Sequence, residues 1–210
     1  LHAAGLTRDA YLLKKDRTQI QAVLAPKVHG SLHLDAVFHD QPLDFFVLFS
    51  SIAAVWGNAG QMDYAYANAF QDSVAGVREQ LRAQGQRHGK TVSIQWPLWA
   101  EGGMHVDAQT QALLTTTLGM RPLSTAEGLA AFTRSLISPY PQYGVMAGDG
   151  LRMGRVLGEG TGNRQAVVAQ DITITGNDAA IDKIRKEIIG EISIVSKIDP
   201  GEIDPDEDLS

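Results

Sequence analysis

The pattern of apolar and polar positions changes its period several times along the chain, and each change predicts a new element. Residues 44–50 contain the apolar run Phe-Phe-Val-Leu-Phe, which carries no charge and is typical of a strand buried on both faces. Residues 63–84 have helical spacing and end in a charged turn before Gly85, so they predict a long helix. Residues 90–96 predict a second strand, which Pro97 ends.

The other predicted elements continue the alternation of strands and helices. Pro26 lies inside one helical pattern and predicts a kink or an early break there. Ser124 and Glu127 predict a capping box at the start of another helix. The alternation as a whole predicts an α/β fold with a doubly wound parallel sheet. The further elements are a strand end at 1–5, helices at 19–38, 108–118 and 125–137, and a last strand at 142–147.

The composition excludes several classes of protein and site. Cysteine is absent, which excludes disulfides, thiolate metal sites and a thiol nucleophile. No apolar run approaches the roughly 20 residues of a membrane span, and we expect no membrane partner. His29 and His33 have i, i+4 spacing but no third ligand is evident, so we predict no metal site.

The net charge is concentrated at one end of the chain. Residues 177–210 contain ten acidic and four basic residues and account for the whole net charge of −6. A neutral body with an acidic tail predicts two units and argues against nucleic acid as a partner. Residues 158–176 are polar, contain glycine and have no apolar period, which is typical of a linker. Residues 178–194 then have isoleucines at helical spacing.

A candidate site lies where the first buried strand meets the long helix. Ser50 and Ser51 end the strand, while Tyr64 and Asn68 lie four residues apart and share one helical face. Open α/β sheets place their chemistry at the carboxyl ends of their strands. Taken singly, each of these residues is typical of packing or capping. Tyr66, the rival phenol, faces elsewhere on the helix, and we interpret it as packing or as substrate-side lining.

Five short motifs follow one another along the chain. They are His2-Ala-Ala-Gly5, Lys27-Val-His-Gly30, Phe49-Ser-Ser51, Tyr64-Ala-Tyr-Ala-Asn68 and Trp96-Pro-Leu-Trp99. Lys27 precedes Ser51 by 24 residues, and Ser51 precedes Tyr64 by 13. In this order and at these spacings, the motifs resemble the ketoreductase domains of modular polyketide synthases, which are short-chain dehydrogenases/reductases. The resemblance covers residues 1–157 and implies a Rossmann-like sheet.

The resemblance implies four catalytic residues for the reduction of a ketone, namely Lys27, Ser51, Tyr64 and Asn68. Reduction builds negative charge on the carbonyl oxygen, which needs a hydrogen-bond donor and then a proton. Tyr64 would supply the proton, and Ser51 would hydrogen-bond the same oxygen. Lys27 would lower the pKa of Tyr64 and hold the ribose of the cofactor. Asn68 would order a water or the lysine, and it stands where most members of the superfamily have their lysine.

The resemblance also implies NADPH as the cofactor and a 3-ketoacyl thioester on a carrier protein as the substrate. Asp9, Trp56 and Gln61 are predicted to lie on the substrate side. In the family, an aspartate at the position of Asp9 and a tryptophan at that of Trp56 accompany opposite hydroxyl configurations. We favour Asp9 and expect a D-configured 3-hydroxyl. The residues predicted to contact the cofactor are Ala4, Gly5, Lys27, Tyr64, Pro97 and Leu98.

The resemblance carries expectations about partners as well. The sequence contains no G-x-G-x-x-G turn, which in the family precedes the position of Leu1. We therefore expect a complementary N-terminal ketoreductase half, or neighbouring synthase domains, as partners. Residues 177–210 resemble the start of an acyl carrier protein, and such a carrier is expected to bring the substrate. A cytoplasmic location is implied. The alternative function is a non-catalytic structural ketoreductase fragment of a synthase.

Overall fold

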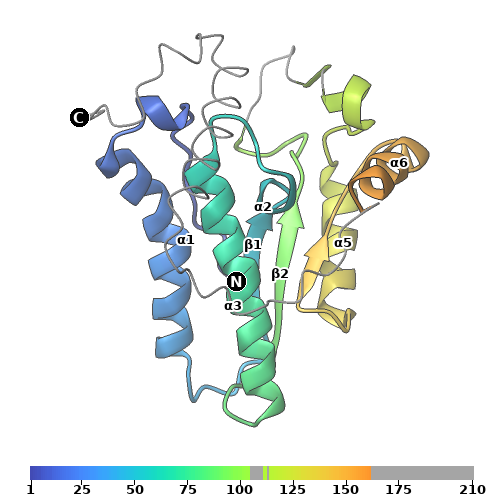
Figure 1. Cartoon of the computed structure of the whole chain (residues 1–210). Coiled ribbons are helices and arrows are strands. Elements are labelled where there is room, and N and C mark those ends of the chain that lie inside the picture. Colours follow the sequence, from blue (N-terminus) through green and yellow to red (C-terminus); the bar gives the residue numbers. More distant parts are fainter. Residues whose placement is uncertain (105–110, 113, 162–210) are drawn as a thin grey trace, which may run out of the picture. The chain divides into compact units, whose positions relative to one another are not determined.

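A three-stranded parallel sheet forms the centre of the chain (Figure 1). The computed structural model describes residues 1–104, 111–112 and 114–161. The strands β1 (Phe45–Ser51), β2 (Lys90–Trp96) and β3 (Gln142–Gly144) are hydrogen-bonded in that order, with Phe49 opposite Ile94. The predicted α/β fold with a parallel sheet is confirmed, although β3 is shorter than the predicted strand.

The first residues extend the sheet beyond β1 by a single bridge. The His2 amide donates to the Val47 carbonyl at 2.8 Å, and the Phe49 amide donates to the His2 carbonyl at 2.9 Å. His2 thereby pairs in parallel with Leu48. This bridge places the turn at Gly5 beside the carboxyl end of β1, where the candidate site was predicted.

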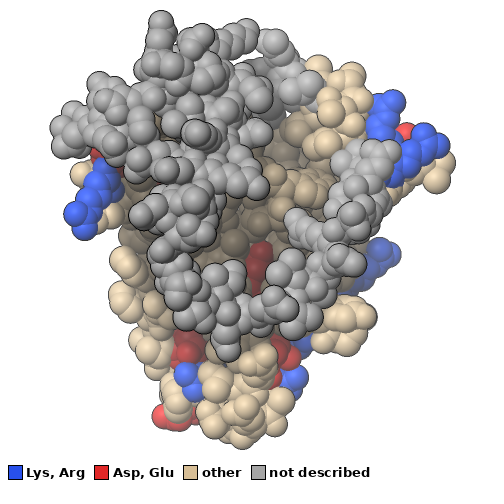
Figure 2. All heavy atoms as spheres, in the orientation of Figure 1, with Lys and Arg blue, Asp and Glu red and all other residues tan. Residues whose placement is uncertain are grey.

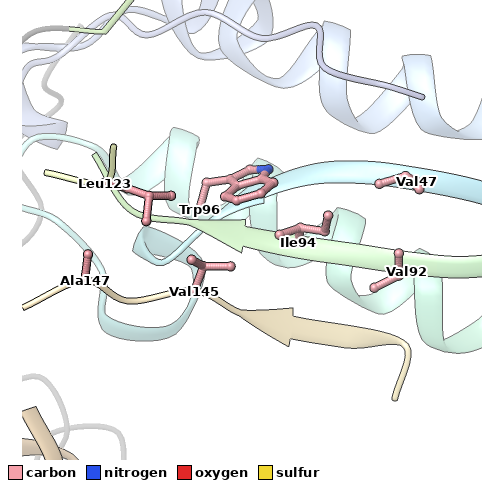
Figure 3. Packing of buried hydrophobic residues seen from close by; sticks show 7 residues of the cluster. All are labelled: Val47, Val92, Ile94, Trp96, Leu123, Val145 and Ala147. Atoms are coloured by element: carbon pink, nitrogen blue, oxygen red, sulfur yellow. The ribbon is translucent and has the colours of Figure 1, made fainter. Parts of the chain in front are cut away.

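Helices cover both faces of the sheet, which explains the uninterrupted apolar run in β1. On one face, Phe46 and Leu48 pack against Ala75 of helix α3 (Met62–Ala83). On the other face, Val47 packs in a cluster that includes residues of helix α5 (Thr125–Ile137). Figure 3 shows the buried members of this second cluster, which are Val47, Val92, Ile94, Trp96, Leu123, Val145 and Ala147.

Helix α1 (Arg17–Val37) packs beside α3 (Figure 1) and continues through its proline. Asp16 caps its start, since the Asp16 side chain accepts from the Gln19 amide at 2.8 Å and the Gln19 side chain accepts from the Asp16 amide. Of the predicted kink or early break at Pro26, the early break is wrong, because α1 is continuous from Arg17 to Val37. The ring removes only one backbone donor, and α1 packs against α3 on both sides of the proline, through Val23 with Tyr64 and through Asp35 with Arg78.

The predicted boundaries are confirmed for α3 to within one residue at each end, and α5 has the predicted capping box between Ser124 and Glu127. Helix α6 (Gly150–Thr161) extends past residue 158, where the linker was predicted to begin. The rest of that linker and the carrier-like residues 177–210 lie outside the described residues. The shorter elements are η1 (Leu12–Lys14), α2 (Ala53–Trp56) and η2 (Leu114–Leu118). Within the helix predicted at 108–118, the described residues 111–112 and 114–118 are helical.

In the visible part of the face in Figure 2, Lys and Arg side chains are scattered mainly along the edges, with acidic side chains among them, and do not form one continuous basic surface. Within the part of the chain that the structure describes, no helix is both long and apolar enough to cross a membrane.

Candidate active site

A cavity of about 580 Å³ opens at the carboxyl ends of β1 and β2. Apolar side chains, including Trp96, Pro97 and Leu98, form much of its wall. Most of the predicted site residues line it, namely Gly5, Lys27, Ser51, Trp56, Gln61, Tyr64, Pro97 and Leu98. The structure therefore brings together residues from β1, from both long helices and from the segment after β2.

Tyr64 lies in the first turn of α3, and its side chain is buried at the cavity. Burial raises the pKa of Tyr64 above its usual value, because the phenolate would lose hydration. Hydrogen bonding with Ser51 and with Asn68 acts in the opposite direction, and the negative charge of Asp9 adds to the rise. At neutral pH Tyr64 is therefore a protonated phenol that can donate.

Ser50 and Ser51 point to opposite sides of β1, as successive strand residues do. Both serines contribute to the cavity wall, and the Ser51 hydroxyl oxygen accepts from the Ala53 amide at 3.2 Å. Ser50 is buried, and its hydroxyl donates to the Asn68 backbone carbonyl at 3.2 Å. Ser51 is thus the hydroxyl beside Tyr64, while Ser50 fastens α3 to the strand.

Lys27 reaches the site from α1 with only 5 % of its surface exposed. Its ammonium donates to the Phe49 carbonyl at 2.5 Å and to the Gln71 side-chain oxygen at 3.0 Å. Burial lowers the pKa of Lys27 to about 8, since the charged form loses hydration, and the negative charge of Asp72 partly opposes this.

We predicted that Lys27 lowers the pKa of Tyr64, and this prediction is wrong. The ammonium lies 6.0 Å from the centre of the Tyr64 ring and is bound to other groups. The pKa of Tyr64 is raised, and burial is the largest cause. Distance and competing hydrogen bonds thus prevent the lysine from acting as the immediate partner of the phenol.

Asn68 is fully buried below Tyr64, one helical turn along α3. Its side-chain amide donates to the Tyr64 backbone carbonyl at 2.7 Å, while its Oδ1 atom has no hydrogen-bond partner among the described residues. Asn68 does not contact Lys27 through any hydrogen bond of the described residues; Gln71 does. Gln71 was missed, although its position three residues after Asn68 puts it on the same helical side.

Of the residues predicted to contact the cofactor, the structure places most at the cavity and one away from it. Gly5, Pro97 and Leu98 line the cavity, whereas Ala4 is exposed and is not among the lining residues. A Cβ atom on Gly5 would lie 2.9 Å from the Lys27 Cε atom, so the backbone and the lysine approach closely here. An apolar wall next to a buried cation and two hydroxyls is the chemical environment that a nicotinamide ring and its ribose require.

The substrate-side residues lie on a loop that packs against the start of α3. Gln61 donates to the Asp9 carboxylate at 2.8 Å, and the Ala10 amide donates to the Gly60 carbonyl at 3.0 Å. Gln61 and Trp56 line the cavity, but Asp9 reaches it only through Gln61. Tyr66 is 58 % exposed and does not line the cavity, so our interpretation of it as packing or lining is wrong.

Lys15 and Asp63 form a buried ion pair that holds the same loop against α3. Each side chain is only 1 % exposed, and Asp63 also accepts from the Tyr64 amide at 2.9 Å. Replacing Lys15 by Met leaves the Asp63 carboxylate buried without its cation, which typically costs about 3–5 kcal/mol. We expect a loss of that size in the free energy of unfolding, measured by urea denaturation.

Lys14 provides the matched control for this variant. It is the neighbouring lysine, it is exposed, and no ion pair of the described residues includes it. Lys14→Met is expected to change the free energy of unfolding by less than about 0.5 kcal/mol. Equal losses for both variants would show that the buried pair does not hold the loop.

Comparison with known proteins identifies the domain to which this cavity belongs. Residues 1–101 match the KR domain family. The chain is 38 % identical over 204 residues to polyketide synthase PksN of Bacillus subtilis (strain 168), covering 94 % of this chain and 4 % of that protein. It is 45 % identical over 149 residues to polyketide synthase ThaG of Burkholderia thailandensis, covering 71 % of this chain and 3 % of that protein.

Solved structures agree with the sequence relatives. A ketoreductase domain from the bacillaene assembly line superposes with a TM-score of 0.71 at 45 % identity, covering 73 % of this chain and 37 % of that one. An N-terminal ketoreductase from the macrolactin assembly line gives a TM-score of 0.65 at 43 % identity, covering 74 % and 29 %. The chain thus spans less than half of either structure. By these comparisons, the chain belongs to the family of ketoreductase domains found in modular polyketide synthases.

Proposed function

We propose that the chain takes part in the NADPH-dependent reduction of a 3-ketoacyl thioester, carried by an acyl carrier protein, to the 3-hydroxyacyl product. The observation that supports this most is the meeting of Ser51, Tyr64 and Lys27 at one cavity. A hydroxyl, a protonated phenol and a buried cation are the groups that a ketone reduction needs. The ketoreductase relatives support the same activity.

In this proposal Tyr64 and Ser51 act on the carbonyl oxygen of the substrate. Both side chains line the cavity, so one oxygen can accept from both hydroxyls. As negative charge develops on that oxygen, the two hydrogen bonds strengthen, and Tyr64 transfers its proton. Because burial keeps Tyr64 protonated, the proton is present before the reaction begins.

Lys27 holds the cofactor side of the cavity. Its ammonium has three protons, and two are used by the Phe49 carbonyl and by Gln71, which leaves one for a ribose hydroxyl. The nicotinamide, when bound, supplies the hydride. Gly5, Pro97 and Leu98 would form the wall beside it, and Asn68 would position Tyr64 from below.

The product configuration is proposed from the substrate-side loop. Asp9 is held by its hydrogen bond with Gln61, and Gln61 lines the cavity. Through Gln61, the loop that carries Asp9 acts on the substrate side of the cavity. Trp56 lines the same cavity, so both marker residues are in place. We keep the D-configured 3-hydroxyl as the expected product, because Gln61 links Asp9 directly to the start of the Tyr64 helix.

The activity is proposed to need the rest of a ketoreductase domain. The chain spans 37 % of one solved ketoreductase chain and 29 % of another. The remaining part would supply the glycine-rich phosphate site. The alternative is a non-catalytic structural fragment of a synthase, for which a cavity lined by Lys27, Ser51 and Tyr64 has no use.

The pH dependence follows from the pKa of about 8 for Lys27. The ammonium is charged below that pH and neutral above it, so kcat/KM is expected to fall as the pH rises through about 8. Tyr64 cannot cause this fall, because burial raises its pKa above the usual value of about 10 for a tyrosine. A pH profile of the initial rates checks the expectation; a kcat/KM that stays flat to pH 10 would contradict it.

The experiment for the proposed function is NADPH oxidation with a 3-ketoacyl thioester. It is run with this chain alone and with the preceding part of its ketoreductase domain added. Turnover that appears in the mixture supports the proposed function, and chiral analysis of the product tests the D configuration. A stable complex that binds NADPH but gives no 3-hydroxyacyl product would favour the structural alternative.

A further inference from the structure

Lys27 is a buried cation whose protein contacts are all neutral. Its two acceptors are a backbone carbonyl and the Gln71 amide oxygen. None of the ion pairs among the described residues includes Lys27. A buried ammonium without a counter-charge loses its proton readily, because desolvation penalises only the charged form. Some nearby anion is needed if Lys27 is to stay charged at neutral pH.

Asp72 is the matching buried anion, and its contacts are neutral as well. It is 6 % exposed, and its carboxylate accepts from the Ser93 hydroxyl at 2.6 Å and from the Gln95 amide at 2.8 Å. Among the described residues no cation lies within 4.0 Å of it. The proposed reaction does not use this carboxylate.

The strand register places these two charges on the same side of the sheet. Ser93 lies opposite Leu48 and Gln95 opposite Ser50, so these side chains share the face that α3 covers. Asp72 projects from α3 onto this face, while the Lys27 ammonium is bound to Gln71, the preceding residue of α3. Burial raises the pKa of Asp72 and lowers that of Lys27, because each charged form loses hydration. Each charge opposes the shift of the other: the negative charge of Asp72 raises the pKa of Lys27, while hydrogen bonds from Ser93, Gln95 and Ser50, together with the positive charge of Lys27, lower that of Asp72.

We propose that Asp72 is a positioning residue that serves as the buried counter-charge of Lys27 and keeps its ammonium protonated through neutral pH. This rests on the proposed role of Lys27 in the reduction. Gln71 fixes where the ammonium lies, by accepting from Lys27 while donating to the Ser31 hydroxyl at 3.3 Å. Asp72 keeps the Lys27 ammonium protonated without a hydrogen bond to it, so the third proton of Lys27 stays free for the ligand.

The other titratable groups around Lys27 do not replace Asp72 in this role. His2, on the segment beside β1, carries no negative charge, and the positive charge of Lys27 helps to lower its pKa. Tyr64, on α3, is protonated at neutral pH because burial raises its pKa. Within the described residues, Asp72 is the one anion whose charge raises the pKa of Lys27.

The test is Asp72→Asn in the complete ketoreductase domain, with the titration of Lys27 followed directly. NMR of ¹³C-labelled lysine side chains gives the pKa, and the Lys27 signal is assigned by its loss in Lys27→Met. Removing a nearby opposite charge is expected to lower the pKa of Lys27 by about 1 unit or more. The alkaline limb of kcat/KM should move to lower pH by the same amount.

Ser93→Ala is the control for a merely structural role. It removes a hydrogen bond from Asp72 but keeps the negative charge. The proposal predicts that Lys27 then titrates close to its wild-type pH, whereas Asp72→Asn shifts it. Equal Lys27 pKa values in wild type and Asp72→Asn would overturn the proposal. If the NMR pKa moves and the rate profile does not, the counter-charge is supported and the role of Lys27 in the reduction fails.

A measurement on the unaltered domain covers the case in which Asp72→Asn does not fold. The ¹³C signal of the Asp72 carboxylate should show an inflection at the pH where Lys27 loses its proton, because the two charges are coupled. A flat Asp72 signal across that titration would overturn the proposal.

Discussion

Replacing Tyr64 by Phe is expected to lower kcat/KM for the 3-ketoacyl thioester by about 10²–10⁴-fold, the usual contribution of a general acid. The ring is buried at the cavity, and the substitution removes only its hydroxyl. The fold should persist, because the remaining ring still packs with Val23 and Ala53. Initial rates of NADPH oxidation, together with the unfolding midpoint, check both parts.

Tyr66→Phe is the matched control, since it removes the same atom two residues away. Tyr66 is exposed and lies outside the cavity, so the kcat/KM of Tyr66→Phe should stay within about twofold of the wild-type value. A Tyr64→Phe variant that keeps wild-type kcat/KM would show that another group supplies the proton, and the proposed assignment of Tyr64 would be wrong.

Replacing Lys27 by Met is expected to lower kcat/KM by about 10²–10³-fold, comparable to the loss of one preorganised donor at an active site. Met fills a similar apolar volume but cannot donate to the cofactor, and it leaves the Phe49 carbonyl and Gln71 without their shared partner. NADPH affinity should fall together with the rate. Titration of bound NADPH by fluorescence and the initial rates measure the two effects.

Lys14→Met controls for the loss of a lysine charge as such. Because Lys14 is exposed, we expect an unchanged rate and an unchanged NADPH affinity. Lys27→Met should also abolish the fall in activity near pH 8, since the group that titrates is gone. A variant that binds NADPH normally and keeps the alkaline limb would remove Lys27 from the cofactor site.

The local pattern predicted the central elements well, because each has one dominant cause. The apolar run of β1 is buried on both faces, and the capping box of Ser124 and Glu127 marks the start of α5. Helix α1 differs from the prediction, because its continuation through Pro26 depends on packing against α3. That contact joins segments far apart in the sequence, and no local pattern contains it.

The sequence was enough to predict several residues of the candidate site, but not the direction in which their pKa values shift. Spacing and resemblance pointed to Ser51, Tyr64 and Lys27, and the structure brings them to one cavity. The direction of the Tyr64 pKa depends on burial and on a 6.0 Å separation from the lysine, which are properties of the assembled fold. Asp72 could be recognised only from the strand register that places Ser93 and Gln95 beneath it.

The measurement that tests the central claim most directly is isotope transfer in the complete ketoreductase domain. NADPH deuterated at the reactive carbon of its nicotinamide is incubated with a 3-ketoacyl thioester on its carrier protein, and the product is analysed by mass spectrometry. We predict one deuterium on the carbinol carbon of the 3-hydroxyacyl product in the wild type, and little product in Tyr64→Phe. A product without deuterium, or as much labelled product from Tyr64→Phe as from the wild type, would contradict the proposal that this cavity carries out the reduction.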